Sequence, residues 1–247
     1  YNPEVGLSAV QWSNALFKPE GEAANGPKGW AKLNTERYPG KQDDITFVNS
    51  KMGWYVNGYG RIYHTKDGGE TWTLQLEKKG TFFRCIAFVD SLVGFAGTVG
   101  TDYFPHVTDT IPLYGTRDGG RTWQPVTYQG PYVKGLCALD IVKEPTINQG
   151  RSDFKVHIFG VGRVGSPANR MVSHDGGMTW TSYTMNEDCK MLFDIKMFDK
   201  NHGIVCASSD DDLSKSNALL LRTSDGGKTW KKVYQSNRPY ETTWKVS

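Results

Sequence analysis

Four stretches of the chain share the pattern [S/T]-x-D-G-G-x-T-W: Thr65-Lys-Asp67-Gly-Gly69-Glu-Thr71-Trp72, then residues 116–123, 173–180 and 223–230. Their aspartates are 51, 57 and 50 residues apart. A repeat of this period is typical of four-stranded propeller blades. The sequence therefore predicts an all-β fold, a β-propeller whose antiparallel blades each carry one copy of the pattern in a turn.

Each position of the pattern has a physical reason. An aspartate that opens a tight turn accepts hydrogen bonds from backbone N–H groups further along, and glycine supplies the positive φ that such a turn needs. The Thr and Trp that follow restart a strand, and we expect the tryptophans between neighbouring blades. The predicted structural residues are Asp67, Gly69, Trp72, Asp118, Gly120, Trp123, Asp175, Gly177, Trp180, Asp225, Gly227 and Trp230.

The composition agrees with many short strands joined by tight turns. The 247 residues include 28 Gly and 13% aromatic residues, and only 38% of the chain is hydrophobic. The net charge is +3, with no basic stripe of the kind that binds nucleic acid. No apolar stretch approaches the roughly 20 residues that cross a bilayer. We therefore expect neither a nucleic-acid partner nor a transmembrane segment.

The residues that most often bind metals do not form a recognisable site. Cys85, Cys137, Cys189 and Cys206 lie far apart, with no C-x-x-C pair and no histidines at zinc spacing. The acidic run 210–212 lacks the alternating spacing of a calcium loop. We expect no metal and no cofactor, and four small buried cysteines. A disulfide stays open, since spacing does not show whether two Cα atoms come within bridging distance.

The repeat divides the chain into blades. We predict four blades at approximately residues 45–76, 84–126, 136–184 and 192–234, within one propeller domain that spans residues 1–247. The termini, residues 5–34 and 242–247, are expected to form or begin a further blade. Two architectures stay open: the two ends close a fifth blade together, or the chain is part of a larger propeller.

The repeated pattern is that of the Asp-box, or BNR repeat, and the sequence resembles the Asp-box β-propellers, which include sialidases, glucanases and sortilin-type receptors. Over about residues 40–247 it is most similar to the photosystem II stability/assembly factor family, through an I-x-F strand at residues 45–47 and a G-W-x-V phrase at residues 53–56. This resemblance implies a non-catalytic exported propeller that holds a client protein during assembly. The start at Tyr1 instead of Met also favours export, to the periplasm, the exterior or a thylakoid lumen.

Long loops concentrate on the propeller face opposite the Asp-box turns, so we expect the binding site there. They comprise insertions near residues 98–113, 160–170 and 208–218 and connections such as 127–135 and 235–241. The family resemblance implies client-binding arginines, and rim tyrosines are typical interaction anchors. The candidate binding residues are Arg84, Arg37, Arg238, Tyr103, Tyr132 and Tyr240. For Arg84, the alternative is an ion pair with an acidic residue of a neighbouring blade.

A carbohydrate-active propeller is the alternative function: a sialidase-like or glucanase-like glycoside hydrolase, or a glycan-binding module. Glycoside hydrolysis needs two carboxyl groups held over a sugar cleft. The acidic residues of the loop-rich face include Asp43, Asp44, Asp102 and Glu187, and the Arg-Ile-Pro motif of sialidases is absent. We favour a scaffold without catalytic residues, with a protein client as partner and a glycan as the second candidate.

Overall fold

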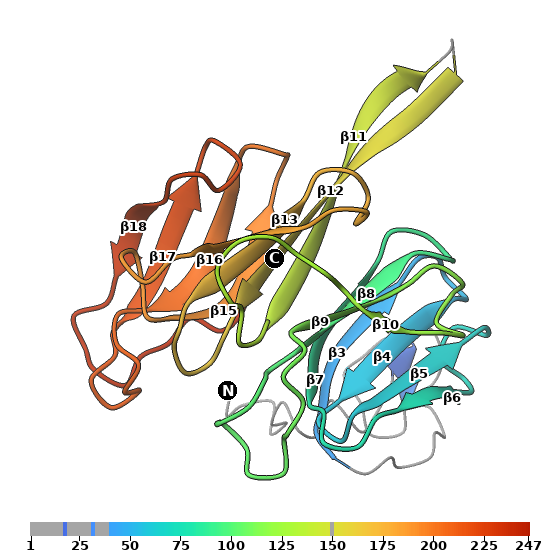
Figure 1. Cartoon of the computed structure of the whole chain (residues 1–247), viewed down its shortest axis with the longest axis horizontal. Helices are drawn as coiled ribbons and strands as arrows, with labels where there is room; N and C mark the ends of the chain where they lie inside the picture. The colour runs from blue at the N-terminus through green and yellow to red at the C-terminus, as the bar shows by residue number, and fades with distance from the viewer. Residues whose placement is uncertain (1–16, 19–30, 33–39, 149–150) are drawn as a thin grey trace.

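The computed structural model describes residues 17–18, 31–32, 40–148 and 151–247, whose regular structure consists of strands (Figure 1). Four antiparallel sheets have four strands each, in chain order, which confirms the predicted all-β fold of four-stranded blades. Blade 1 contains β3 (Gln42–Phe47), β4 (Gly53–Asn57), β5 (Arg61–Thr65) and β6 (Thr73–Glu77), and blade 2 contains β7 (Phe83–Phe88), β8 (Gly94–Thr98), β9 (Leu113–Thr116) and β10 (Gln124–Pro125). Blade 3 contains β11 (Ala138–Asn148), β12 (Arg151–Gly162), β13 (Asn169–Ser173) and β14 (Thr181–Thr184), and blade 4 contains β15 (Met191–Met197), β16 (Gly203–Ser208), β17 (Ala218–Thr223) and β18 (Lys231–Gln235).

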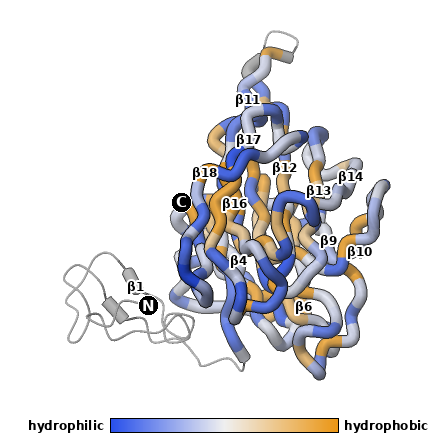
Figure 2. Tube along the Cα trace, turned by 90° about the vertical axis from the view of Figure 1, so that its left-hand side faces the viewer, coloured by the Kyte–Doolittle hydropathy of each residue, from blue (hydrophilic) through white to orange (hydrophobic). Residues whose placement is uncertain are grey.

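Consecutive blades contact through their first strands, β3 with β7, β7 with β11 and β11 with β15, while β6 and β18 lie at the outside (Figure 1). Three apolar clusters fill the spaces between consecutive blades. Trp54 and Phe83 are fully buried between blades 1 and 2, and Leu136 and Met171 between blades 2 and 3. Figure 2 shows the apolar segments of the strands within the sheets.

The Asp-box turns have the predicted chemistry. In blade 2, Asp118 accepts hydrogen bonds from Thr122 N at 2.9 Å and Thr122 Oγ1 at 2.7 Å, while Thr116 Oγ1 accepts one from Gly120 N at 2.9 Å. The same bonds recur in the other three boxes. Both box glycines of blade 2 have positive φ, 75° at Gly119 and 86° at Gly120, a region that costs other residues energy. Each box is therefore a turn closed by its own side chains.

The box tryptophans differ in what they contact. Trp180 is 3% exposed and packs edge-on against Phe95 of blade 2, with ring centroids 5.2 Å apart. Trp123 and Trp230 pack against the clusters between blades 1 and 2 and between blades 3 and 4. Trp72 instead contacts Tyr55 and Phe47 of its own blade. The predicted contact with a neighbouring blade is thus shown for Trp180. Trp123 packs edge-on against Phe88 of its own blade at 5.9 Å, much as Trp72 packs against Phe47.

One feature of blade 3 is not expected from the sequence. Strands β11 and β12 pair over their whole length, from Ala138 with Val161 to Asn148 with Arg151, and the hairpin reaches well beyond the blade (Figures 1 and 2). Ile147 is 83% exposed and Phe154 is 55% exposed on this arm. Blade 3 runs from Ala138 to Thr184, and its first two strands are far longer than those of the other blades.

The two termini are placed differently. Strands β1 (Phe17–Lys18) and β2 (Ala31–Lys32) form a two-stranded sheet, and the rest of the predicted segment 5–34 lies outside the described residues. Near the C-terminus, Val246 N donates to Asp194 Oδ2 at 2.8 Å, as Ile86 N donates to Asp44 Oδ2 at 2.9 Å between blades 1 and 2. Residue 246 thus occupies the place of the next first strand, and the further blade stays a prediction.

The four cysteines are buried free thiols. Burial raises the pKa of the Cys189 thiol to about 12 and that of Cys206 to about 11, so both stay protonated near neutral pH.

In the described part of the chain, no helix is long and apolar enough to cross a membrane.

Replacing Trp180 tests its role between the blades. We expect Trp180→Ala to lower the free energy of unfolding by about 3–5 kcal/mol, because a large buried side chain is lost and a cavity remains. Trp72→Ala is expected to cost less than half as much, since Trp72 is only half-buried. Urea denaturation followed by fluorescence measures both, and equal losses would contradict the different placement of the two rings.

The ionised carboxylate of Asp118 should make the thermal stability of the protein depend on pH. Hydrogen bonds from Thr122 N and Thr122 Oγ1 lower the pKa of Asp118 to about 2, against about 3.9 in an unfolded chain. The stabilisation is therefore complete above about pH 4 and is lost as the pH falls towards 2. Asp118→Asn should lower Tm by a few degrees at pH 7 and flatten the decline of Tm between pH 4 and 2. Asp153→Asn, on the exposed hairpin arm, is the control and should leave the profile unchanged.

Candidate binding face

The loop-rich face is built from segments that leave the strands opposite the Asp-box turns. These are residues 99–112 between β8 and β9, residues 163–168 between β12 and β13, and residues 209–217 between β16 and β17. The first insertion has a small core of its own, in which Val99 and Val107 are buried against Phe82, with Phe104 stacked on that ring at 4.7 Å. This loop is therefore an ordered part of the face.

Arg163 holds two of these loops together. The residue is 3% exposed, and its Nη1 donates to Val99 O and Thr101 O, both at 2.7 Å. Its Nε donates to Gly165 O at 3.0 Å. Burial lowers the pKa of Arg163, although an arginine stays charged at any physiological pH. Arg163 thus fixes the insertion of blade 2 against the loop of blade 3.

Two predicted tyrosines are exposed beside this anchor. Tyr103 is 41% exposed and Tyr132 is 59% exposed, and a Cβ atom at Gly165 would lie 3.5 Å from both the Tyr103 ring and Arg163 Nη2. Next to Tyr103, Asp102 has a φ of 71° and forms an ion pair with Lys134, whose hydrogen bond lowers the pKa of Asp102. The Lys134–Asp102 ion pair therefore joins the insertion that carries Tyr103 to the connection that carries Tyr132.

An aromatic row continues from this point to blade 1. Tyr103 packs edge-on against Phe104 at 4.8 Å, and His106 lies 5.8 Å from Phe104 and 5.8 Å from Tyr59, measured between ring centroids. Tyr59 is 58% exposed in the β4–β5 turn. Tyr59 is not among the residues predicted from the sequence, because its turn is short and carries no insertion. The row presents aromatic rings on the loop-rich face.

Arg84 is placed deeper than the tyrosines. Its side chain is 19% exposed, and its Nη1 lies 3.6 Å from Oδ1 of Asp43 in the neighbouring blade. Asp43 also accepts from Lys41 Nζ at 2.7 Å, and burial raises its pKa in spite of these two cations. Arg84 therefore forms the interblade ion pair that the sequence left open as the alternative to client binding.

The other predicted residues lie apart from this cluster. Arg238 forms an ion pair with Glu241, and Tyr240 is 75% exposed with a φ of 65°. Within the described residues, no hydrogen bond, ion pair or ring contact joins either of them to Tyr103 or Tyr132. Arg37 lies outside the described residues.

Most of the acidic residues that are candidates for glycoside hydrolysis either form hydrogen bonds or ion pairs, or lie in a separate cavity. Asp44 accepts from Ile86 N and Ile45 N, and burial raises its pKa. Asp102 is paired with Lys134. Glu187 lines a separate cavity of about 330 Å³ beside Asp188, whose pKa is raised by burial and by Glu187. Asp43, with its raised pKa and one buried carboxyl oxygen that lacks a hydrogen-bond partner in the described structure, is the acidic residue least satisfied by its surroundings.

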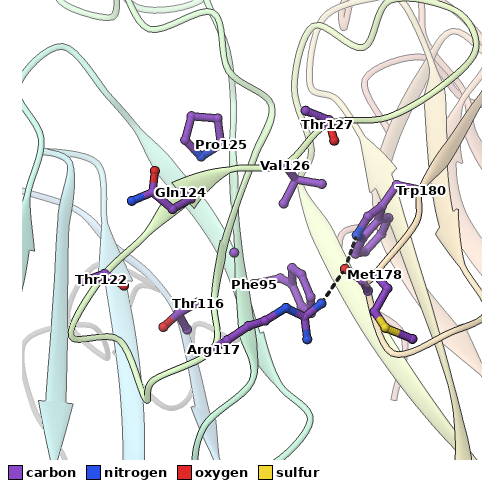
Figure 3. Close-up of a pocket in the computed structure, with 12 residues that line it drawn as sticks. Phe95, Thr116, Arg117, Thr122, Gln124, Pro125, Val126, Thr127, Met178 and Trp180 are labelled. Atoms are coloured by element: carbon purple, nitrogen blue, oxygen red, sulfur yellow. Dashed lines mark hydrogen bonds between the residues drawn. The ribbon is translucent and has the colours of Figure 1, made fainter.

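The opposite face has a cavity of about 380 Å³ between blades 2 and 3 (Figure 3). Arg117 Nη2 and Trp180 Nε1 both donate to Gly177 O, at 2.9 and 3.2 Å. Phe95 and Val126 supply apolar parts of its lining. The guanidinium of Arg117 therefore joins blade 2 to blade 3 through Gly177 O. Among the described residues, no cluster of three or more His, Cys, Asp or Glu side chains is arranged to hold a metal ion.

The fold and the four closed turns define this protein as an Asp-box β-propeller. The BNR/Asp-box repeat family matches residues 171–182, the box of blade 3. No curated protein matches the sequence significantly.

Solved structures resemble this chain at low sequence identity. An ancestral GH74 enzyme is 16% identical with a TM-score of 0.55, and the match covers 78% of this chain but only 25% of the enzyme. This likeness supports the fold alone. YCF48 bound to a D1 peptide is 14% identical over 78% of this chain and 82% of its own, with a TM-score of 0.34. YCF48 from Cyanidioschyzon merolae is 14% identical over 77% and 84%, with a TM-score of 0.30.

Removing the Arg163 anchor should loosen the face. Arg163→Met leaves the carbonyl oxygens of Val99 and Thr101 without their donor, so we expect a loss of about 2–4 kcal/mol in the free energy of unfolding. Amide hydrogen exchange of residues 99–104 should accelerate more than that of the strands. Arg222→Met, at an exposed position of β17, is the control and should change stability by less than about 0.5 kcal/mol. Unchanged exchange in residues 99–104 would contradict the anchoring role.

Proposed function

We propose that this protein is a non-catalytic scaffold that binds a protein client through its loop-rich face, as the photosystem II stability/assembly factor family is expected to do. The observation that carries the proposal is a pair of exposed tyrosines on two loops that the Lys134–Asp102 ion pair joins. Tyr103 lies on the insertion that the buried Arg163 anchors, and Tyr132 lies on the adjoining connection. We also propose that the protein works after export.

A rigid exposed aromatic surface favours protein binding. Tyrosine supplies a large contact area at a low cost in conformational entropy, and ordering of loops before binding reduces the entropy lost on association. Tyr59 extends this surface along the row through His106. Arg84 is largely buried in its ion pair with Asp43, which leaves the exposed tyrosines as the first contacts for a client.

A carbohydrate-active propeller is the second candidate. Aromatic rings also stack on sugars, and Asp43 has the raised pKa that a general acid requires. Hydrolysis would need a second carboxyl at a suitable separation. The adjacent Asp44 carboxylate is used in hydrogen bonds to two backbone N–H groups, which favours the scaffold over the hydrolase.

Binding and turnover together test the proposal. Wild-type protein immobilised as bait is expected to retain a specific client, and Tyr103→Ala combined with Tyr132→Ala should weaken that binding at least about tenfold, or 1.4 kcal/mol. Tyr234→Ala, at a 47% exposed position of β18, is the matched control and should bind like the wild type. Surface plasmon resonance with the recovered client measures all three.

The same proteins should be tested on aryl sialosides and xyloglucan oligosaccharides. We expect no turnover by the wild type. Turnover that disappears in Asp43→Asn would overturn the scaffold proposal and establish the hydrolase instead. Glycan binding without turnover, lost in the double tyrosine variant, would support a glycan-binding module.

A further inference from the structure

Arg170 occupies a position that is apolar in the other three blades. It stands three residues before the first residue of its Asp-box, where blades 1, 2 and 4 have Ile62, Leu113 and Leu220. Ile62 and Leu113 are fully buried, and Arg170 itself is only 8% exposed. Burying a guanidinium at an aliphatic position is costly unless a partner compensates its charge and its donors. The fold does not require this arginine, so another role is indicated.

The guanidinium of Arg170 is incompletely satisfied. Its central carbon lies 3.9 Å from the centroid of the Tyr183 ring, and this stacking holds the plane of the group. A Cβ atom at Gly227 would lie 3.7 Å from Nη1, so the group points towards the Asp-box of blade 4. In the described structure, no acceptor is hydrogen-bonded to its N–H groups. Burial lowers the pKa of Arg170, which shows that its surroundings disfavour the charge.

The nearest acidic residue does not supply the missing acceptor. Asp225 acts on Arg170 electrostatically, but its carboxylate accepts from Thr229 N, Thr229 Oγ1 and Thr223 Oγ1 within the Asp-box. These short bonds, at 2.6–2.9 Å, fix the carboxylate in its turn.

A cavity of about 420 Å³ opens beside Arg170, between blades 3 and 4 on the Asp-box face. Its lining includes the cations Lys200 and Lys228 together with His174, and Asp225 is the only acidic residue in that lining. Lys200 is paired with Glu144 of the hairpin arm at 2.6 Å, whereas Lys228 is exposed at the Asp-box turn and forms no ion pair with the described residues. With Glu144 set against Lys200 and the ionised Asp225 against one further cation, Arg170 and Lys228 leave the cavity with an excess of one positive charge.

The cavity between blades 2 and 3 also contains an arginine, but there the guanidinium has an acceptor within the protein. There the arginine is Arg117 of the Asp-box, and its Nη2 donates to Gly177 O across the blade interface (Figure 3). Leu113 fills the position that corresponds to Arg170. The two structural interblade arginines thus have acceptors within the protein, a backbone carbonyl for Arg117 and the Asp43 carboxylate for Arg84.

We propose that the cavity between blades 3 and 4 is a binding site for an oxyanion, a sulfate, phosphate or carboxylate group, with Arg170 as its main ligand and Lys228 at its rim. The planar fork of a guanidinium matches two oxygens of such a group. Tyr183 keeps the fork in place, and the anion supplies the acceptors that the protein does not. The site lies on the face opposite the proposed client surface and does not depend on it.

Titration calorimetry with sodium sulfate, at an ionic strength kept constant with sodium chloride, tests the site. Wild-type protein should bind one sulfate ion, and Arg170→Leu should weaken binding at least about tenfold. Because leucine occupies the corresponding positions in blades 2 and 4, this variant should fold with a Tm in chloride equal to or above that of the wild type. Arg117→Leu is the matched control and should bind sulfate within about twofold of the wild type.

Phosphate and acetate titrations distinguish a site for tetrahedral anions from one for carboxylates. Lys228→Gln changes an exposed side chain and should weaken sulfate binding about threefold, which keeps the test valid if Arg170→Leu fails to fold. Absence of any binding by the wild type, or equal binding by wild type, Arg170→Leu and Lys228→Gln, would overturn the proposal.

Discussion

Each of the four blades depends on a turn whose hydrogen bonds come from its own side chains. The Asp-box carboxylate accepts from the N–H and hydroxyl of the threonine four residues on, while the first hydroxyl of the box accepts from the second glycine. This closure is local, so it requires no contact between blades. Trp180 contacts the neighbouring blade through Phe95, and buried carboxylates such as Asp44 bridge the first strands.

The long connections between the second and third strands of the blades leave the face opposite the Asp-box turns. The insertion of blade 2 is anchored by Arg163 and has its own small apolar core, which holds the exposed Tyr103 on this face. The Asp-box face carries a different kind of variation, in which a charged residue replaces an aliphatic one at Arg170. A common framework thus supports two chemically distinct surfaces, one aromatic and one cationic.

The sequence predicts features that depend on local chemistry and misses those that depend on distant pairing. The boxes, the four blades and the exposure of Tyr103 and Tyr132 follow from turn residues and loop position. Pairing of Arg84 with Asp43 joins residues 41 positions apart, and no local pattern could select it over a client contact. The hairpin arm was missed because its length depends on the pairing of β11 with β12. Aligning the four repeats would have revealed Arg170 among aliphatic residues.

A client bound through the loop-rich face should slow the hydrogen exchange of that face. The exchange is measured on the protein alone and on the protein saturated with the client that it retains. We expect protection of residues 99–112, 127–135 and 163–168, with little change at the four Asp-box turns. Protection confined to the Asp-box turns or to the hairpin arm would show instead that the client binds elsewhere.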